Sequence, residues 1–335
     1  MRIALVSFAH VHAQSYARVL TELEKDGIAE MCAVCDDDSR RLALARERFE
    51  SKKLYSDIEE LARDPDVDAA IVTSENTKRA GLAISLLNAG KHVLAEKPIS
   101  SKVPDAVRMV QLASENGLTL GTAFPMRHHD APQSMKRVLS DLGGIRSISS
   151  ANPGRFPGLW FADPGASGGG AIMDHTVHVA DLARWFSGRE FSEVYALRGR
   201  SVAGEGSGEG SGLVLCKLED DTPVSVDCSW SRLAGWPTWG NVFVSACAEK
   251  GAAVLSAFNE NLWTVVQGSY KWSYYGPDAD KKMILDFVRA VEKHSQALAT
   301  GTDGLRALEV VAAAYESIKR QRPVKISEIR GSGSY

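Results

Sequence analysis

Two carboxylates and an imidazole recur at helical spacing within residues 168–188. Asp174, His178 and Asp181 stand at i, i+4 and i+7, so one helix face would present all three. Polar groups on an otherwise apolar helix are costly to bury unless they serve a site or a satisfied hydrogen-bond network. We interpret this face as a site, with a structural network as the alternative. A metal ion is a further alternative, but Lys97 would be a poor neighbour for a cation, so we predict no metal site.

An aspartate at the end of the second predicted strand is placed to bind a dinucleotide. The first 36 residues have the layout of a dinucleotide-binding βαβ unit: a strand at Arg2–Phe8, a turn, a helix and a second strand that ends at Asp36. The Asp36 carboxylate would accept hydrogen bonds from the adenosine ribose hydroxyls and repel a 2′-phosphate, which favours NAD over NADP. A turn and helix N-cap at residues 36–38 is the alternative. Arg40 and Arg41 could accept a 2′-phosphate, so NADP remains an alternative cofactor.

The turn after the first predicted strand lacks the three glycines of the usual G-x-G-x-x-G sequence, and Ser7, Ala9 and His12 take their places. Ala9 is small enough to let a pyrophosphate approach, whereas Ser7 and His12 would not supply free φ > 0 geometry. His12 opens a helix, whose N-terminus favours anions and disfavours a protonated imidazole. A neutral His12 would then donate an N–H to phosphate. A buried packing histidine is the alternative.

A lysine follows the apolar run His92–Ala95, in the sequence Glu96-Lys97-Pro98. If the run is a strand of a parallel sheet, Lys97 lies at the carboxyl edge, where ligands of such sheets bind. A lone Glu-Lys-Pro is usually a surface turn. Its position directly after this strand favours a lysine beside the nicotinamide ring of a bound cofactor.

Over residues 1–123, strand-like and helix-like sequence patterns alternate. These elements must position the side chains described above. Such alternation predicts a doubly wound parallel sheet of the Rossmann type, with helices on both faces. The expected strands are Arg2–Phe8, Glu30–Cys35, Ala69–Ser74, His92–Ala95 and Thr119–Ala123, and the expected helices lie near 13–25, 38–49, 57–63, 78–89 and 102–116.

The pattern changes after Phe124, so residues 124–335 are predicted to form a second α/β domain with a large, open, mainly antiparallel sheet. The Gly- and Ser-rich stretch Gly204–Gly212 is expected to be a flexible, solvent-exposed loop without chemistry. The expected helices lie near 133–142, 174–187, 279–295 and 303–320, and the expected strands at 191–200, 212–219, 222–231, 241–247 and 262–267.

Composition limits the possible partners and location of the chain. Its 335 residues carry a net charge of -3 and no stretch rich in Lys and Arg, so we expect no nucleic-acid partner. No apolar run approaches the roughly 20 residues that span a bilayer, and the N-terminal run leads into a helix rather than a cleavage site, so we expect a cytoplasmic protein without membrane contact. The five cysteines, including Cys32 and Cys35, are interpreted as free thiols.

Three segments together resemble the glucose–fructose oxidoreductase, inositol dehydrogenase and rhizopine-catabolism family, written Gfo/Idh/MocA. The resemblance extends over nearly the whole chain and rests on AISLLNAGKHVLAEKPIS (83–100), GGGAIMDHTVHVADLARWFSG (168–188) and TDGLRALEVVAAAYESIKRQRPVKI (302–326). It implies an NAD(P)-dependent oxidoreductase that acts on sugars or cyclitols. It further implies that Lys97, Asp174 and His178 match the catalytic lysine, aspartate and histidine. Two departures are the missing glycines and residues 75–79, Glu-Asn-Thr-Lys-Arg, where the family has Pro-Asn-x-x-His.

The expected reaction is hydride transfer between nicotinamide and a secondary alcohol or ketone of a sugar, cyclitol or sugar derivative. His178 would be the general base, Lys97 would stabilise the oxyanion, and Asp174 would bind a neighbouring hydroxyl. An NAD-dependent lyase or glycosidase that uses transient oxidation, and a non-catalytic binding protein, are the alternatives. The predicted cofactor site contains Ser7, Ala9, His10, His12, Asp36, Ser74, Asn76, Glu96 and Lys97, with Asn76 implied by the resemblance.

Further substrate contacts are expected from the second domain. Arg127, Arg155 and Trp160 join Lys97, Asp174 and His178 in the predicted substrate site. Burial in the core is the alternative for Trp160, Trp236 and Trp239, and solvation is the alternative for His128 and His129. Because a long sheet needs a cover on its outer face, we expect a homodimer or homotetramer through the C-terminal sheet.

Overall fold

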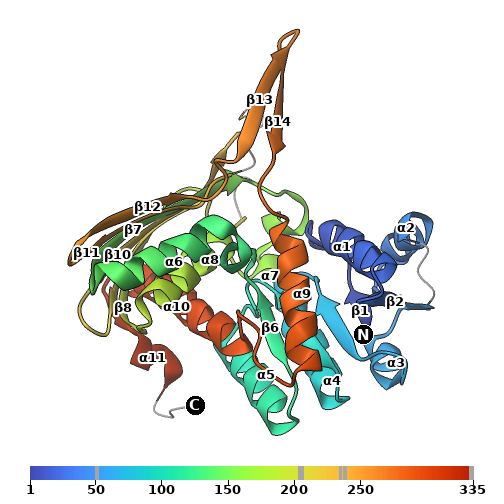
Figure 1. The fold of residues 1–335 in the computed structure, drawn as a ribbon. Coiled ribbons are helices and arrows are strands. Elements are labelled where there is room, and N and C mark those ends of the chain that lie inside the picture. The colour runs from blue at the N-terminus through green and yellow to red at the C-terminus, as the bar shows by residue number, and fades with distance from the viewer. Residues whose placement is uncertain (50–52, 203–206, 234–235, 237–239, 332–335) are drawn as a thin grey trace. The chain divides into compact units, whose positions relative to one another are not determined.

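The computed structural model describes residues 1–49, 53–202, 207–233, 236 and 240–331. The chain forms two compact units (Figure 1). Unit 1 contains residues 1–125 and 279–305, and unit 2 contains residues 126–278 and 306–335. None of the described helices is both long enough and apolar enough to cross a membrane.

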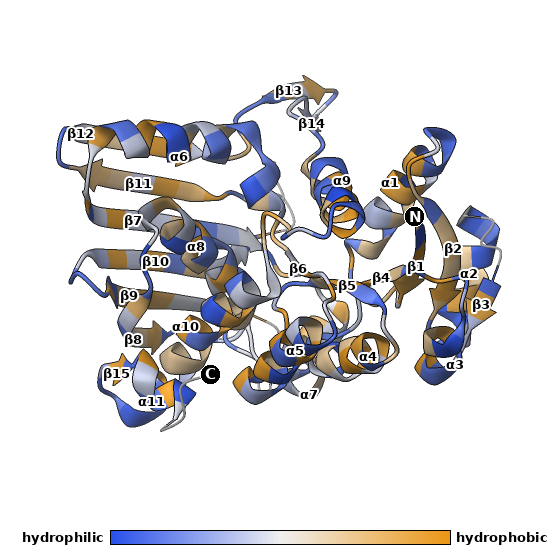
Figure 2. Ribbon diagram, turned by 60° about the horizontal axis from the view of Figure 1, so that its bottom comes forward, coloured by the Kyte–Doolittle hydropathy of each residue, from blue (hydrophilic) through white to orange (hydrophobic). Residues whose placement is uncertain are grey.

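A six-stranded parallel sheet forms the centre of unit 1, in the order β3-β2-β1-β4-β5-β6. This is the strand order of doubly wound dinucleotide-binding sheets, which confirms the predicted Rossmann domain. Figure 2 shows α1 and α9 on one face of the sheet and α4 and α5 on the other. The strands are β1 (Arg2–Val6), β2 (Glu30–Cys35), β3 (Lys53–Tyr55), β4 (Ala69–Val72), β5 (His92–Glu96) and β6 (Leu120–Ala123), and the helices are α1 (Ala13–Lys25), α2 (Ser39–Phe49), α3 (Ile58–Arg63), α4 (Asn76–Asn88), α5 (Val103–Glu115) and α9 (Ala279–Glu292).

The central strands are buried on both faces, which explains their continuous apolar sequences. Cys32 and Cys35 are buried free thiols, as expected, and burial raises the pKa of Cys32 to about 11 and that of Cys35 to about 12. Strand β3 was not predicted, because three half-buried residues at a sheet edge give no periodic pattern.

Helix α9 belongs to unit 1, which differs from the single division predicted between residues 123 and 124. Its apolar face, including Ile284 and Phe287, lies in one core cluster with Ile3 of β1 and Leu20 of α1. Contacts so distant in sequence leave no signal in composition or periodicity, so a linear reading assigns α9 to the second domain.

A seven-stranded mixed sheet forms unit 2, in the order β12-β11-β7-β10-β9-β8-β15. The β7–β10 pair is parallel and the other pairs are antiparallel, so the predicted mainly antiparallel sheet is confirmed. The strands are β7 (Ile145–Arg155), β8 (Phe191–Arg198), β9 (Ser211–Leu218), β10 (Pro223–Arg232), β11 (Phe243–Ala248), β12 (Gly251–Ser256) and β15 (Val324–Lys325). The helices are η1 (Pro125–His128), α6 (Asp130–Leu142), η2 (Leu159–Ala162), α7 (Pro164–Ser167), α8 (Ala171–Ser187), α10 (Gly301–Arg320, which begins in unit 1) and α11 (Ile326–Arg330).

Two parts of this unit differ from the predictions. The segment predicted at 262–267 does not join the large sheet, because β13 (Asn261–Val266) pairs only with β14 (Ser269–Tyr274) in a separate ribbon. In the large sheet, the central strand β7 was not predicted, since its Ser-, Asn-, Pro- and Gly-rich sequence resembles a loop.

One face of the large sheet carries the helices that matter for the site. Helix α8 packs on β7, β9 and β10, and α6 packs on β12, as Figure 2 shows. On the strands, burial alternates with exposure, which leaves Leu213 and Leu215 of β9 and Val254 of β12 exposed on the opposite face. We call this opposite surface the open face of the sheet.

Candidate active site

The turn after β1 adopts the backbone geometry of a glycine turn without a glycine. Ser7 has φ +72°, although the sequence suggested that serine would not supply this geometry. The Thr73 hydroxyl donates to the Ser7 carbonyl oxygen (2.5 Å) and the Ala9 amide donates to Ser7 Oγ (3.1 Å). The Phe8 amide donates to Asp36 Oδ2 (2.7 Å). These bonds hold the unfavourable conformation in place.

Asp36 lies at the carboxyl end of β2, as predicted, and its carboxylate is fully buried. It accepts from the Asp38 amide (3.0 Å) and from Arg41, whose Nε lies 2.9 Å from both carboxylate oxygens. With the Phe8 amide, these donors occupy most of the acceptor sites of one carboxylate. Asp36 therefore also anchors the turn, a role that the sequence did not suggest.

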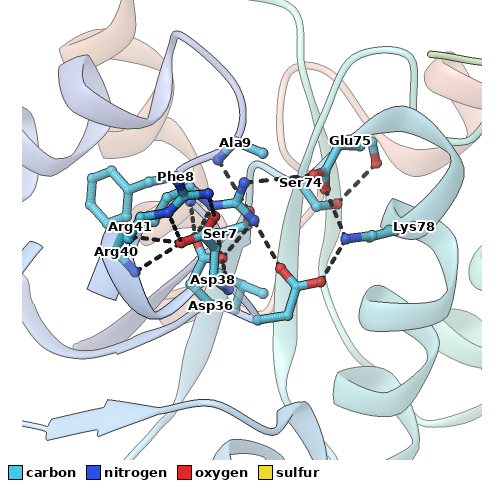
Figure 3. A network of polar contacts seen from close by, with 12 residues as sticks. Ser7, Phe8, Ala9, Asp36, Asp38, Arg40, Arg41, Ser74, Glu75 and Lys78 are labelled. Atoms are coloured by element: carbon cyan, nitrogen blue, oxygen red, sulfur yellow. Dashed lines mark hydrogen bonds and ion pairs between the residues drawn. The ribbon is translucent and has the colours of Figure 1, made fainter. Parts of the chain in front are cut away.

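A cavity of about 230 Å³ opens at the carboxyl ends of β1, β2 and β4. Ser7, Asp36 and Ser74 line it, and the Ile58 and Leu82 side chains provide apolar walls. Glu75 and Lys78 of the β4–α4 segment close its other side, in the polar network of Figure 3. The apolar walls and polar edge suit an adenosine group, so we name it the adenosine cavity.

Arg79 is a buried cation that sequence reasoning did not include in the site. Its guanidinium is fully buried and donates to the carbonyl oxygens of Ser74 (2.5 Å) and Pro98 (2.5 Å) and to Asn76 Oδ1 (3.0 Å). It thereby ties the segment after β4 to the turn that contains Lys97. The family pattern has histidine at this position, so the arginine was visible in the sequence as a departure from the family.

Glu96, the last residue of β5, gathers a buried polar cluster. Its Oε2 accepts from the Tyr16 hydroxyl (2.6 Å), and its Oε1 lies 3.3 Å from His12 Nδ1. Burial would lower the pKa of His12, but the charge of Glu96 and this hydrogen bond outweigh it and raise the pKa. Glu96 is thus a partner of His12 that the sequence did not suggest, and the contact of His12 with phosphate stays a prediction.

The same cluster brings three potential metal ligands together. Donor atoms of His10, His12 and Glu96 lie within 4.8 Å of one another. However, the His12 amide donates to His10 Nδ1 (3.2 Å), both Glu96 oxygens are in hydrogen-bond contact, and the positive charge of Lys97 acts on the whole group. These contacts favour a hydrogen-bonded cluster over a metal site, and the absence of a metal stays a prediction.

Lys97 follows β5 directly and is only 4% exposed. It lies at the carboxyl edge of the sheet, which is where the sequence placed it. Unit 1 thus has a buried lysine at the same sheet edge as the adenosine cavity.

On unit 2, helix α8 presents Asp174 in a fixed orientation. Trp230 Nε1 donates to Asp174 Oδ2 (3.1 Å), and His175 Nε2 lies 3.1 Å from the same oxygen. His175 is held in turn by Asn152, whose carbonyl oxygen accepts from its Nδ1 (2.5 Å). Trp230, His175 and Asn152 were missed at the sequence level, because β10 and β7 bring two of them to α8 only in the folded sheet. His178, one turn further along α8, is partly exposed.

Arg127 is engaged by Asp181 in a buried, bidentate ion pair. Its Nε lies 2.8 Å from Asp181 Oδ2 and its Nη2 lies 2.6 Å from Oδ1, with both side chains at most 3% exposed. The ion pair gives Arg127 and Asp181 a partner that the sequence did not suggest. The predicted substrate contact of Arg127 stays a prediction.

The other predicted substrate contacts, Arg155 and Trp160, have partners within unit 2. The Arg155 guanidinium donates to the Trp236 carbonyl oxygen, and Trp160 stacks on Phe161 with ring centroids 3.9 Å apart. Trp236 is exposed and Trp239 lies outside the described residues. The loop histidines His128 and His129 are buried, although solvation was the expected alternative.

The start of α8 is capped by a residue of the Gly-rich stretch. Glu209 Oε1 accepts from the amides of Gly170 (3.2 Å) and Ile172 (2.9 Å) and from the Tyr315 hydroxyl (2.9 Å). Of the predicted solvent-exposed loop 204–212, residues 204–206 lie outside the described residues. Residues 207–212 contact α8 instead of solvent alone, and Glu209 is 9% exposed. A carboxylate at a helix N-terminus satisfies amides that the helix leaves unpaired, so Glu209 stabilises the helix that carries Asp174.

Comparison with known proteins supports this geometry. The family described as "Oxidoreductase family, NAD-binding Rossmann fold" matches residues 1–124, and the "GFO/IDH/MocA C-terminal domain" matches residues 133–253. Myo-inositol 2-dehydrogenase of Thermotoga maritima is 28% identical, over 99% of this chain and 100% of its own length. The 1,5-anhydro-D-fructose reductase of Ensifer adhaerens is 29% identical, over 80% of this chain and 82% of its own.

A solved structure agrees in fold. Scyllo-inositol dehydrogenase of Lactobacillus casei, crystallised with NAD(H) and scyllo-inositol, superposes with a TM-score of 0.83 at 22% identity, over 98% of this chain and 99% of its own. The two family matches together include the six-stranded sheet, strands β7 to β11 of the large sheet, and the segments that contain Asp36, Lys97 and Asp174. The chain therefore belongs to the Gfo/Idh/MocA family of NAD-binding oxidoreductases.

Proposed function

We propose that this protein is an NAD-dependent dehydrogenase that oxidises a secondary alcohol of a cyclitol, sugar or sugar derivative, or reduces the corresponding ketone. The observation that carries the proposal is the fixed Asp174 carboxylate on α8, with His178 one helical turn away. The activities named for relatives, on inositols and on 1,5-anhydro-D-fructose, support the same substrate class.

The residues of unit 1 fit a dinucleotide. The adenosine cavity lies at the carboxyl edge of the parallel sheet, beside the β1–α1 turn, where such sheets bind nucleotides. Glu75 Oε2, which has no hydrogen-bond partner among the described residues, is a buried acceptor on its wall. A ribose hydroxyl or an adenine amino group would satisfy it. NAD, when bound, supplies the hydride acceptor for alcohol oxidation.

Three side chains would perform the remaining chemistry. His178 would take the hydroxyl proton at an imidazole nitrogen, and the Lys97 ammonium would stabilise the negative charge that develops on the same oxygen. Asp174 would accept a hydrogen bond from a neighbouring hydroxyl, which favours a substrate with vicinal hydroxyl groups.

A panel of cyclitols and sugars tests this proposal. Each compound is incubated with the protein and NAD+ or NADP+, and NADH or NADPH formation is followed by absorbance. We expect turnover on at least one polyol with vicinal secondary hydroxyls, faster with NAD+. Stoichiometric NAD binding by calorimetry without net turnover on any polyol or corresponding ketone would contradict a dehydrogenase.

A further inference from the structure

A network of charges spans the adenosine cavity between two loops (Figure 3). From the side of β2 and α2, Arg41 contacts Asp36 and also Asp37, with Nη2 2.8 Å from Asp37 Oδ1. From α4, Lys78 Nζ lies 2.5 Å from Asp37 Oδ2. Glu75 joins both cations, because its Oε1 lies 3.8 Å from Arg41 Nη1 and its Oε2 lies 3.7 Å from Lys78 Nζ.

Arg41 is the cation best placed to meet a 2′-phosphate, since it contacts the carboxylate expected beside the ribose. Three carboxylates surround it, and their charges outweigh the effect of burial and raise its pKa. Lys78 is similarly engaged by Asp37, which raises the pKa of the lysine. A phosphate would have to compete with Asp36, Asp37 and Glu75 for these cations.

Glu75 differs from the other two acids in its surroundings. It is 8% exposed and lines the cavity, and its Oε2 accepts no hydrogen bond from any described residue. The neutral donors around Asp36 already occupy that carboxylate, whereas Glu75 offers the cavity an acceptor together with a negative charge. A ribose hydroxyl would satisfy that oxygen, and a 2′-phosphate would be repelled by it.

We infer that Glu75 is a specificity-determining residue of the adenosine site: its carboxylate repels a 2′-phosphate and presents its own acceptor to the ribose. This deepens the proposed function, because it rests on a preference for NAD over NADP. Residue 75 falls at the position of proline in the family pattern, so a carboxylate at this place in the cavity is a departure of this chain from that pattern.

Calorimetric titration of the Glu75→Gln variant tests the inference. Gln keeps the shape of Glu75 but removes its charge. The probes are NAD+, NADP+, 5′-AMP and 2′,5′-ADP, and the last two report on the adenosine site without catalysis. We expect the affinity for 2′,5′-ADP relative to 5′-AMP to rise roughly tenfold or more, the scale of like-charge contacts at binding sites.

Two further variants complete the design. Glu115→Gln makes the same chemical change on α5 at the opposite edge of the sheet, and its selectivity should equal that of the parent. Adding Arg41→Met to Glu75→Gln should leave the gain largely in place, because Arg41 stays paired with Asp36 and Asp37 and the gain comes from the lost charge of Glu75.

The outcomes separate this inference from the proposed function. An unchanged 2′,5′-ADP to 5′-AMP ratio in a Glu75→Gln protein of normal melting temperature would overturn the role of Glu75. A gain that disappears without Arg41 would overturn direct repulsion of the phosphate by Glu75. A parent protein that prefers NADP+ would instead contradict the proposed NAD preference, whatever the variants do.

Discussion

Single residues at this site act through partners from other elements. Trp230 and His175 both contact Oδ2 of Asp174, so the carboxylate can present Oδ1 in one orientation. Orientation of this kind matters because a catalytic contact misplaced by about 1 Å can cost on the order of a hundredfold in rate.

Lys97 and His178 provide the decisive test of the proposed chemistry. Lys97→Ala and His178→Ala should each lower turnover by roughly two orders of magnitude or more, the scale of general acid–base and oxyanion groups, with cofactor affinity nearly unchanged. Steady-state rates, NAD titration and thermal unfolding on the same preparations check this. The exposed Lys25 and His294, changed to Ala, serve as controls. Parent-like turnover in either test variant would remove that residue from the mechanism.

His12 predicts a pH-dependent stability. Because Glu96 raises the folded-state pKa of His12 above its ordinary value of 6.5, the ion pair contributes fully below about pH 6.5. Its contribution declines as the pH rises through the raised value. The difference in unfolding free energy between the parent and His12→Gln should therefore be largest in acid and shrink toward alkaline pH. Denaturant unfolding over this range measures it, and a difference that grows with pH would contradict the pairing.

The residues predicted from sequence and the residues missed differ in how far their partners lie along the chain. Asp36 and Lys97 could be located because each directly follows a strand of a regular βαβ pattern. Trp230, Arg79 and Glu209 could not, since each acts through a contact that exists only after strands from distant segments pair. The ion pair of Arg127 with Asp181 was likewise not predicted, because the two residues lie 54 positions apart in the sequence.

Helix α8 depends on a close approach of two backbone segments. A Cβ on Gly170 would collide with the backbone of Glu209, and one on Gly208 would collide with Gly170. Glycines at these positions let residues 207–212 reach the helix N-terminus and cap it.

Gly170→Ala should therefore be strongly destabilising. Overpacking of this kind costs about 1–3 kcal/mol, and the loss of the Glu209 cap adds to it. Gly81→Ala is the control, because Gly81 lies inside helix α4 with no neighbour within 4 Å of a new Cβ, and it should stabilise by about 0.4–1 kcal/mol. Chemical denaturation measures both. Equal stabilities for the two variants would refute the close approach.

The elements that sequence predicted well are those with a strong local pattern. Helix α1 and strand β2 agree with their predicted bounds at both ends, because periodicity and flanking residues mark them. Strand β7 failed because its neighbours β10 and β11 supply its burial, so Pro153 and Gly154 suggested a loop. The prediction for the ribbon of β13 and β14 failed for a different reason. The alternating sequence indicated a strand, but it does not show which sheet the strand joins.

At the scale of the whole molecule, the open face of the large sheet is the surface best suited to association. Exposed Leu213, Leu215 and Val254 lie on it, and a hollow of about 340 Å³ is lined by Tyr195, Leu215 and neighbouring strand residues. Exposed large apolar side chains on an uncovered sheet face are typical of an interface.

Leu215→Glu should accordingly convert an oligomer to monomers, because a buried, unpaired carboxylate at an interface is costly. Light scattering at micromolar concentration measures the mass of the parent and the variant. Leu44→Glu, on an exposed position of α2 in unit 1, is the matched control and should keep the parent mass. A monomeric parent protein would contradict the expected homodimer or homotetramer.

The chain returns to unit 1 after most of unit 2, so the parts of the unit 1 core are synthesised at different times. A ribosome releases the six strands of the Rossmann sheet long before it makes α9, whose Ile284 and Phe287 lie in the same core as Ile3 and Leu20. Until then, apolar surface beside α1 lacks its cover. The large sheet of unit 2 is almost complete by residue 256, so its strands can pair before α9 is made and covers this surface of unit 1.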